Sequence, residues 1–314
     1  MEVQNYRQNF DDGLCLKNFV KNFDLDVRTV YKVACWSKLK KMAGMTDYDD
    51  DLFTAIYDQN MRKLVHWNDI RLIQFVEDLV VNDFKFEPTI ANKRYATLLY
   101  YDLYGKKLDT NVFSSVDEAL CEFGRHKVFI DELLELLDYL TDRLNVATSP
   151  ISEFGADYPL ALFGCYSRVE QLILLGKMDA TNIFNPQSGL FQINELNTEL
   201  LWVTLNKSDK DFSPTTQYND YAINETLFHW QSQNNVSPDR TGRRFVEQRV
   251  NGKKFVLFIR ENKRDAYNFT EDYYCLGLVD FVNSVGERPM SITWRLHNPM
   301  PGFILDKAEK LAVG

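Results

Sequence analysis

The densest group of side chains that could do chemistry lies between Asn206 and Asn234, where aromatic rings alternate with carboxylate, hydroxyl and amide groups. Aromatic rings stack on nucleobases, at about 1–3 kcal/mol per base. A carboxylate such as that of Asp220 can accept a hydrogen bond from the exocyclic amine of cytosine. Six residues are therefore candidates for contacting a base: Tyr218, Asp220, Tyr221, His229, Trp230 and Ser232. An aromatic core strand with a polar outer face is the competing interpretation.

Residues 227–233 would present two different surfaces if they form a strand, because successive side chains point to opposite faces. The two sets are Phe228, Trp230 and Ser232 on one face, and Leu227, His229, Gln231 and Gln233 on the other. The pattern predicts one apolar face and one that offers hydrogen-bond donors and acceptors.

A basic segment follows at 240–264, with nine Arg or Lys residues and two Glu residues, although the chain carries a net charge of −9. Local charge of this kind favours contact with phosphate, with a solvated surface as the alternative. The residues predicted to contact phosphate are Lys207, Arg240, Arg243, Arg244, Lys253 and Lys254. Asn251-Gly252 between two strand-like runs, Phe245 to Val250 and Lys253 to Arg260, predicts a β-hairpin in this segment.

One catalytic alternative comes from Asp239, which follows a proline, and from Glu261 and Lys263, which follow an apolar strand. The arrangement is similar to that of metal-dependent nucleases, in which two carboxylates hold the ion and a lysine positions water. It is a degenerate pattern, and Asp239 lies in a turn-forming sequence. The chain lacks nucleotide-binding glycine loops and histidine pairs at metal-ligand spacing, so we expect no catalytic residue, no metal and no cofactor.

The elements that must position these residues change in character along the chain. Apolar residues recur every three or four positions through Ile70–Val80 and Ile130–Leu144, as expected of packed helices. Ser115-x-x-Glu118 and Ser167-x-x-Glu170 are predicted capping boxes, and Gly176 would end the second helix.

After residue 185 the apolar runs are short, aromatic and β-branched, as in strands. The fold class we predict is α+β: a helical bundle, residues 1–150, followed by a mainly β domain, residues 151–314, with a curved sheet or half-barrel. The sequence contains no apolar run long enough to cross a bilayer and no secretory signal, so we expect a cytoplasmic protein that does not contact membranes.

From Pro159 onward the sequence resembles an uncharacterised C-terminal domain of bacterial proteins that join a phospholipase-D-like nuclease to a DEAD/DEAH helicase. The segments that carry the resemblance are YSRVEQ at 166–171, the stretch 189–235 with its TLNKS and FHWQSQ motifs, GRRF at 242–245, FVLFIREN at 255–262, YCLGLVDF at 274–281 and RPMSITWRL at 288–296. These proteins resemble SauUSI-type restriction enzymes, which act on DNA carrying 5-methylcytosine or 5-hydroxymethylcytosine.

The resemblance implies that residues 151–314 form an SRA/PUA-like domain that reads a modified cytosine in double-stranded DNA by base flipping. It implies that residues 1–150 couple this domain to the nuclease and helicase of a parent enzyme, whose motifs this chain lacks. A homodimer is compatible with the sequence. The remaining alternative is an interaction module that holds a protein partner or a second copy.

Overall fold

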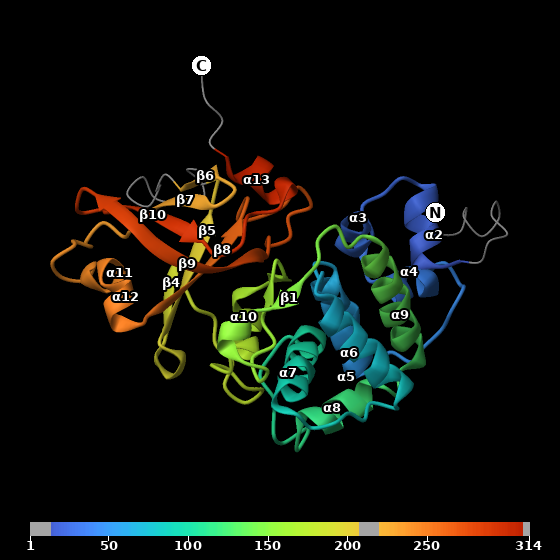
Figure 1. The fold of residues 1–314 in the computed structure, drawn as a ribbon. Helices are drawn as coiled ribbons and strands as arrows, with labels where there is room; N and C mark the ends of the chain where they lie inside the picture. Colours follow the sequence, from blue (N-terminus) through green and yellow to red (C-terminus); the bar gives the residue numbers. More distant parts are fainter. Residues whose placement is uncertain (1–13, 207–219, 310–314) are drawn as a thin grey trace. The chain divides into compact units, whose positions relative to one another are not determined.

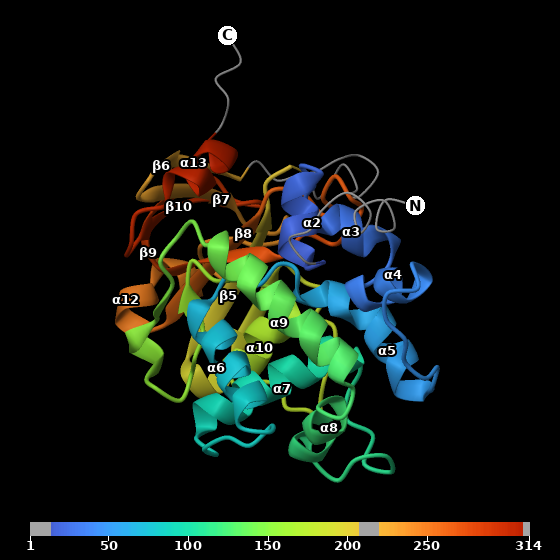
Figure 2. The ribbon, with the colours of Figure 1, turned by 90° about the vertical axis from the view of Figure 1, so that its right-hand side faces the viewer.

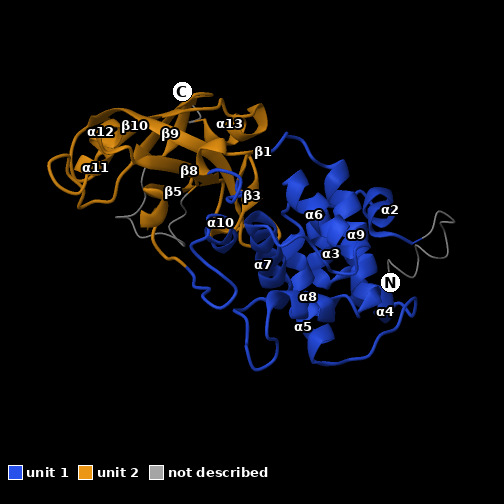
Figure 3. Ribbon diagram, turned by 60° about the horizontal axis from the view of Figure 1, so that its bottom comes forward, with its two compact units in different colours: residues 1–148, 155–160, 169–185 blue, residues 149–154, 161–168, 186–314 orange. Residues whose placement is uncertain are grey.

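The structure is a computed structural model, and it describes residues 14–206 and 220–309. The described residues form two compact units (Figure 3). Unit 1 comprises residues 1–148, 155–160 and 169–185, and unit 2 comprises residues 149–154, 161–168 and 186–314. The predicted α+β class is confirmed, with helices first and a sheet afterwards. The chain first leaves unit 1 at residue 148 but returns to it twice, so the units do not follow the predicted ranges 1–150 and 151–314.

Unit 1 is built from helices. In chain order they are α2 (Leu16–Asn22), α3 (Val27–Val33), α4 (Trp36–Met42), α5 (Leu52–Asn60), η1 (Met61–Leu64), α6 (Ile70–Val81), α7 (Ile90–Tyr104), α8 (Val116–Phe123), α9 (Lys127–Asp142) and most of α10 (Arg168–Leu174). The apolar stripe predicted along residues 130–144 buries Leu133, Leu137 and Leu140 of α9. That helix packs against α2, α4 and α6, as Figure 2 shows.

The helix ends follow the sequence signals in part. Ser115 caps α8 by accepting a hydrogen bond from the backbone N–H of Glu118, as predicted. The Glu118 carboxylate instead accepts from the backbone and hydroxyl of Ser114, so the predicted reciprocal bond to Ser115 is displaced by one residue. Gly176 has a φ of +69° just after α10, the left-handed conformation that a glycine adopts at low cost.

The start of α4 is stabilised by a carboxylate from another helix. Glu132 of α9 is fully buried and accepts hydrogen bonds from the backbone N–H groups of Trp36 and Ser37, at 2.9 and 2.8 Å. Burial raises the pKa of Glu132, while these hydrogen bonds oppose the increase.

A second buried polar cluster joins α7 to α10 inside unit 1. Asp102 and Glu170 are each 1% exposed. Asp102 accepts a hydrogen bond from the Trp67 ring at 3.1 Å, and the Glu170 carboxylate lies 2.9 Å from His66 Nε2. Burial raises the pKa of Asp102 well above its usual value, and the neighbouring Glu170 raises it further.

Unit 2 contains the strands. They are β1 (Ser149–Pro150), β2 (Ala161–Leu162), β3 (Cys165–Tyr166), β4 (Leu190–Ile193), β5 (Thr198–Thr204), β6 (Tyr221–Asn224), β7 (Leu227–Gln231), β8 (Lys254–Arg260), β9 (Tyr273–Val285) and β10 (Ser291–Leu296). The short helices are η2 (Ser152–Phe154), η3 (Asn194–Leu196), α11 (Arg243–Val246), α12 (Gln248–Asn251) and α13 (Gly302–Ala308). The short apolar runs after residue 185 thus fall mainly in strands, as their composition predicts.

The main sheet has the order β4-β5-β8-β9-β10-β7-β6, with β3 also paired to β9. Neighbouring strands are antiparallel except β5 and β8, which are parallel. Because β4 and β6 lie at the two ends of this order, the described strands form an open sheet, with α13 beside β6 (Figure 1).

The hairpin predicted around Asn251-Gly252 is wrong. Residues before the pair form α11 and α12 rather than a strand, and Gly252, with a φ of +56°, ends α12. A positive φ serves a helix C-terminus as well as a type I′ turn, so the dipeptide alone does not distinguish them.

The core of unit 2 lies between one face of the sheet and α11 and α13. Trp294 of β10 is fully buried at its centre, with Phe255, Phe228 and Ile304 in the same cluster. Among the described residues, no helix is both long and apolar enough to cross a membrane.

Replacing Asp102 by Asn tests the buried cluster of unit 1. Because the folded-state pKa of Asp102 is raised, the wild-type protein loses stability as the pH rises from the usual Asp pKa through the raised value. The substituted amide cannot ionise but still accepts a hydrogen bond from Trp67, so the stability of Asp102→Asn relative to wild type should increase with pH. Urea unfolding at a series of pH values measures this difference. If the free energy of unfolding changed with pH in the same way for both proteins, the pKa of Asp102 would not be raised by burial, which would contradict this description of the cluster.

Candidate nucleic-acid interface

Strand β7 has the two faces that its alternation predicts. Phe228 and Trp230 are buried, whereas Leu227, His229 and Gln231 are partly exposed. Trp230 is only 6% exposed, and its ring centre lies 5.5 Å from that of Phe245 and 6.3 Å from that of Trp294. The prediction that Trp230 stacks on a base is therefore wrong, because its faces are taken up by the core.

Ser232 and Asp220 are also structural rather than available to a base. Ser232 is fully buried; its hydroxyl accepts from the backbone of Met290 at 2.9 Å and donates to the carbonyl of Gln233 at 3.2 Å. Asp220 is 8% exposed and accepts from the backbone N–H of Gln231 at 2.9 Å, which extends the pairing of β6 with β7. Both predicted roles in base recognition are corrected on these grounds.

The remaining described candidates, Tyr221 and His229, lie together on the outer face of the sheet. They are directly opposite each other on β6 and β7. Their rings are stacked, with centres 4.7 Å apart and planes inclined by 15°. Both side chains are partly exposed, so together they form a ring platform at the surface of unit 2. Tyr218 and Lys207 lie outside the described residues.

The strand register places polar side chains next to this platform. His229 is opposite Thr293 of β10, and Thr293 is opposite Asn283 of β9. Thr293 is partly exposed and Asn283 is exposed, so a row of hydrogen-bonding groups continues from the rings across three strands. Sequence reasoning missed Thr293 and Asn283 because strand order across the sheet cannot be deduced from local spacing.

Two of the predicted phosphate ligands neutralise a buried carboxylate instead. Glu199 of β5 is 3% exposed. Arg244 donates to both of its oxygens, at 2.9 and 3.1 Å, and Lys253 Nζ lies 3.2 Å away. Since the Lys253 side chain is only 8% exposed, its charge is internal to the fold. The phosphate role predicted for Lys253 is therefore wrong, whereas that of Arg244, whose side chain is 30% exposed although it is paired with Glu199, stays a prediction.

The other basic candidates differ in how they are held. Lys254 donates to the carbonyl of Glu153 at 3.1 Å and lies over the Phe154 ring. Arg243 pairs with Glu247 at 3.3 Å, although its side chain remains 66% exposed. Arg240 is exposed. Only Arg240 and Arg243 of the described candidates are thus well placed to meet an external phosphate.

The residues of the nuclease alternative have other partners. Asp239 accepts a hydrogen bond from the Ser237 hydroxyl at 2.7 Å, which is the main cause of its lowered pKa. Glu261 forms an ion pair with Lys307 at 3.0 Å. Within residues 14–206 and 220–309, no group of three or more His, Cys, Asp or Glu residues is arranged to hold a metal ion.

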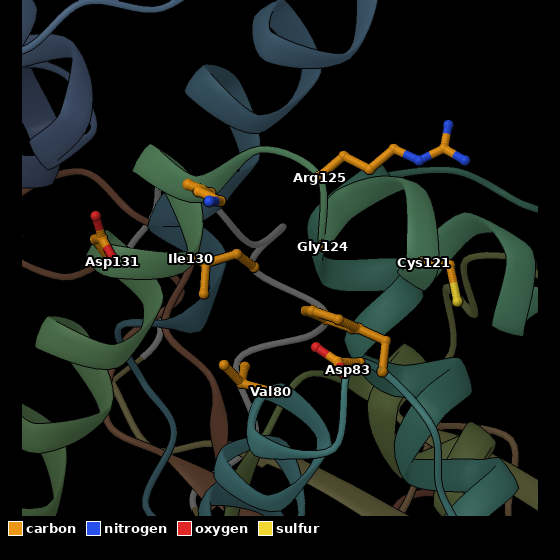
Figure 4. Close-up of a pocket in the computed structure, with 9 residues that line it drawn as sticks. Val80, Asp83, Cys121, Gly124, Arg125, Ile130 and Asp131 are labelled. Atoms are coloured by element: carbon orange, nitrogen blue, oxygen red, sulfur yellow. The ribbon is translucent and has the colours of Figure 1, made fainter.

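A surface hollow of about 390 Å³ lies in unit 1 and does not involve the predicted base-binding residues. Val80 of α6 and Ile130 of α9 line it together with Asp83, Cys121 and Arg125 (Figure 4). Its lining mixes apolar and oppositely charged side chains and contains no aromatic pair that could enclose a base.

Comparison with protein families bears on the part of the chain that carries this ring platform. Residues 160–308 match the family model of a domain of unknown function, DUF3427. This uncharacterised domain is found in helicase-associated proteins. The match includes β6, β7, β9 and β10, and it extends over somewhat less than half of the chain. No curated protein matches the chain.

Replacing Trp230 by Ala separates the core role from a binding role. Loss of this buried ring should lower the free energy of unfolding by about 3–5 kcal/mol. Tyr221→Ala, which removes a partly exposed ring from the opposite face of the sheet, should cost distinctly less. Denaturant unfolding of both variants measures the difference. A Trp230→Ala protein with wild-type stability would contradict its placement in the core.

Proposed function

We propose that unit 2 is a DNA-binding module, in which the outer face of β6, β7, β10 and β9 contacts an unstacked base. The observation that carries the proposal is the stacked Tyr221–His229 pair, which is partly exposed among polar side chains. Aromatic side chains on an open sheet face are a common means of holding unstacked bases, because every base has a π-face.

The platform is organised before a ligand arrives. Pairing of β6 with β7 fixes the backbones that carry Tyr221 and His229, and each ring restricts the other. Little conformational entropy is therefore lost when a base stacks on either ring. Thr293 and Asn283 offer a hydroxyl and an amide to the edge of that base, which supplies hydrogen bonds in addition to stacking.

The preference that we propose within this function is for cytosine with a substituent at C5, as in the restriction enzymes that the sequence resembles. Its physical support is the apolar side chains beside the platform. Leu227 shares the outer face of β7 with His229. Ile223 lies in β6 at the irregularity between Ala222 and Asn224 and is 45% exposed. A methyl group that contacts these side chains leaves water, which contributes about 0.8 kcal/mol per buried carbon of this size.

The proposal is tested by titrating the intact chain into labelled oligonucleotides and following fluorescence anisotropy. The set contains single strands and duplexes that differ only at one cytosine, which is unmodified, 5-methylated or 5-hydroxymethylated. Tyr221→Ala and His229→Ala should each weaken binding by about 1–3 kcal/mol, or roughly 5- to 150-fold in Kd. The modified oligonucleotides should bind more tightly than the unmodified one.

Two controls make the result specific to the ring platform. Tyr221→Phe keeps the ring and should bind with a Kd near that of wild type. Val250→Ala removes an 85% exposed side chain of α12 and should leave binding and stability unchanged. Failure of the wild-type chain to bind any of the oligonucleotides would contradict the proposal and favour an interaction module, whereas magnesium-dependent nicking would favour the nuclease alternative.

A further inference from the structure

Two arginines of unit 2 lie against the ring of one buried tyrosine. Arg168 is the first residue of α10 and Arg260 is the last residue of β8. Their guanidinium carbons lie 5.3 and 4.5 Å from the ring centre of Tyr273, which is 2% exposed. Arg168 also lies 4.7 Å from the ring centre of Trp202. Both arginine residues are partly exposed to solvent.

Neutral acceptors fix the orientation of both guanidinium groups. Arg168 donates to the carbonyl of Pro186 at 3.1 Å and to the hydroxyl of Tyr273 at 2.9 Å. Arg260 donates to the hydroxyl of Thr204 at 2.9 Å and to the carbonyl of Glu271 at 3.1 Å. These contacts hold the two planes in place but cancel none of their charge.

The pair differs in this respect from Arg244 and Lys253, which share the buried carboxylate of Glu199. Within residues 14–206 and 220–309, neither Arg168 nor Arg260 forms an ion pair with a carboxylate. Burial lowers the pKa of Arg260, and the charge of Arg168 lowers it further, whereas Tyr273, Asp272 and Glu271 act in the opposite direction. Two like charges thus influence each other in a partly desolvated place, and the carboxylates of Asp272 and Glu271 offset this only in part, because the net shift in the pKa of Arg260 is downward. A bound anion would relieve the remaining repulsion.

Several donors of the pair remain available. Each guanidinium has five N–H groups, of which the structure uses two on Arg168 and two on Arg260. Arg168 Nε also has no hydrogen-bond partner in the described structure, but it is shielded from solvent and so is not among the donors that an external phosphate meets directly. A planar guanidinium suits the oxygens of a phosphate group because it can donate two parallel hydrogen bonds.

We infer that Arg168 and Arg260 form a phosphate-binding site, in which the two guanidiniums, oriented by Tyr273, Trp202 and neutral acceptors, hold one phosphate group. The phosphate belongs to a DNA backbone or to a free nucleotide. Sequence reasoning does not find this site, because Arg168 falls within a predicted capping box and Arg260 at the end of an apolar run. The site does not depend on the contact that Tyr221 and His229 are proposed to make.

The experiment uses the intact chain and two probes, inorganic phosphate and an unmodified oligonucleotide. Isothermal titration should detect phosphate binding to wild type, and Arg168→Gln and Arg260→Gln should each weaken it at least about tenfold. Arg249→Gln removes the same charge from an exposed residue of α12 and should have little effect. For the oligonucleotide, each Gln variant at 168 or 260 should reduce the slope of log Kd against log salt by about one.

Because Arg168 also packs on two rings, the thermal melt of Arg168→Gln is compared with that of wild type. If Arg168→Gln is destabilised, the phosphate affinities of Arg168→Lys and Arg260→Gln test the site instead. Arg168→Lys keeps the positive charge but loses the planar guanidinium, so it should retain only part of the phosphate affinity. Competition between phosphate and the oligonucleotide identifies the backbone as the source, whereas phosphate binding without competition excludes the backbone and favours a free phosphate compound such as a nucleotide.

Different results would contradict the phosphate site and the proposed DNA-binding function. Absence of phosphate binding to wild type, or equal binding by wild type and Arg260→Gln, would overturn the phosphate site even if the oligonucleotide binds. Phosphate binding that is lost in Arg260→Gln, in a chain that binds no oligonucleotide, would support the site and overturn the proposed function.

Discussion

The basic segment at residues 240–264 is anchored to the sheet through its ion pairs with the carboxylate of Glu199. This carboxylate is buried at the start of β5, where β5 pairs in parallel with β8, and it is neutralised by Arg244 from α11 and Lys253 just before β8. A buried charge is tolerated only when a partner and hydrogen bonds compensate for the water it loses. The ion pairs therefore connect α11 and the residue before β8 to the buried carboxylate of β5, and the Lys253 charge is internal to the fold.

The same constraint explains what remains available for binding. Arg168 and Arg260 are held by rings and neutral oxygens, and within residues 14–206 and 220–309 neither forms an ion pair with a carboxylate. Tyr221 and His229, in turn, lie on the sheet face that the core does not cover.

Much of the local structure could be predicted because it depends on neighbours in sequence. The alternation of Phe228 and Trp230 with His229 and Gln231 indicates the two faces of β7, and Ser115 and Gly176 mark helix ends. The prediction that Trp230 stacks on a base is wrong because alternation places this residue on the apolar face of β7 with Phe228. Its ring packs in the core of unit 2.

The rest depends on residues that are distant in sequence. Lys253 follows Asn251-Gly252 in a pattern typical of a hairpin, and only the parallel pairing of β5 with β8 brings Glu199 to it. The row from Tyr221 through His229 and Thr293 to Asn283 likewise depends on the strand order β9-β10-β7-β6. The approach of Arg168 and Arg260 to Tyr273 joins three segments whose spacing contains no shared pattern.

The most direct test of the central claim is to locate the base on the protein. An oligonucleotide with 5-iododeoxycytidine at one position is irradiated in complex with the intact chain, and the cross-linked peptide is sequenced by mass spectrometry. The account predicts cross-links at Tyr221 or His229, the two rings of the outer face. Cross-links confined to residues of unit 1, or to unit 2 residues away from β6 and β7, would contradict it.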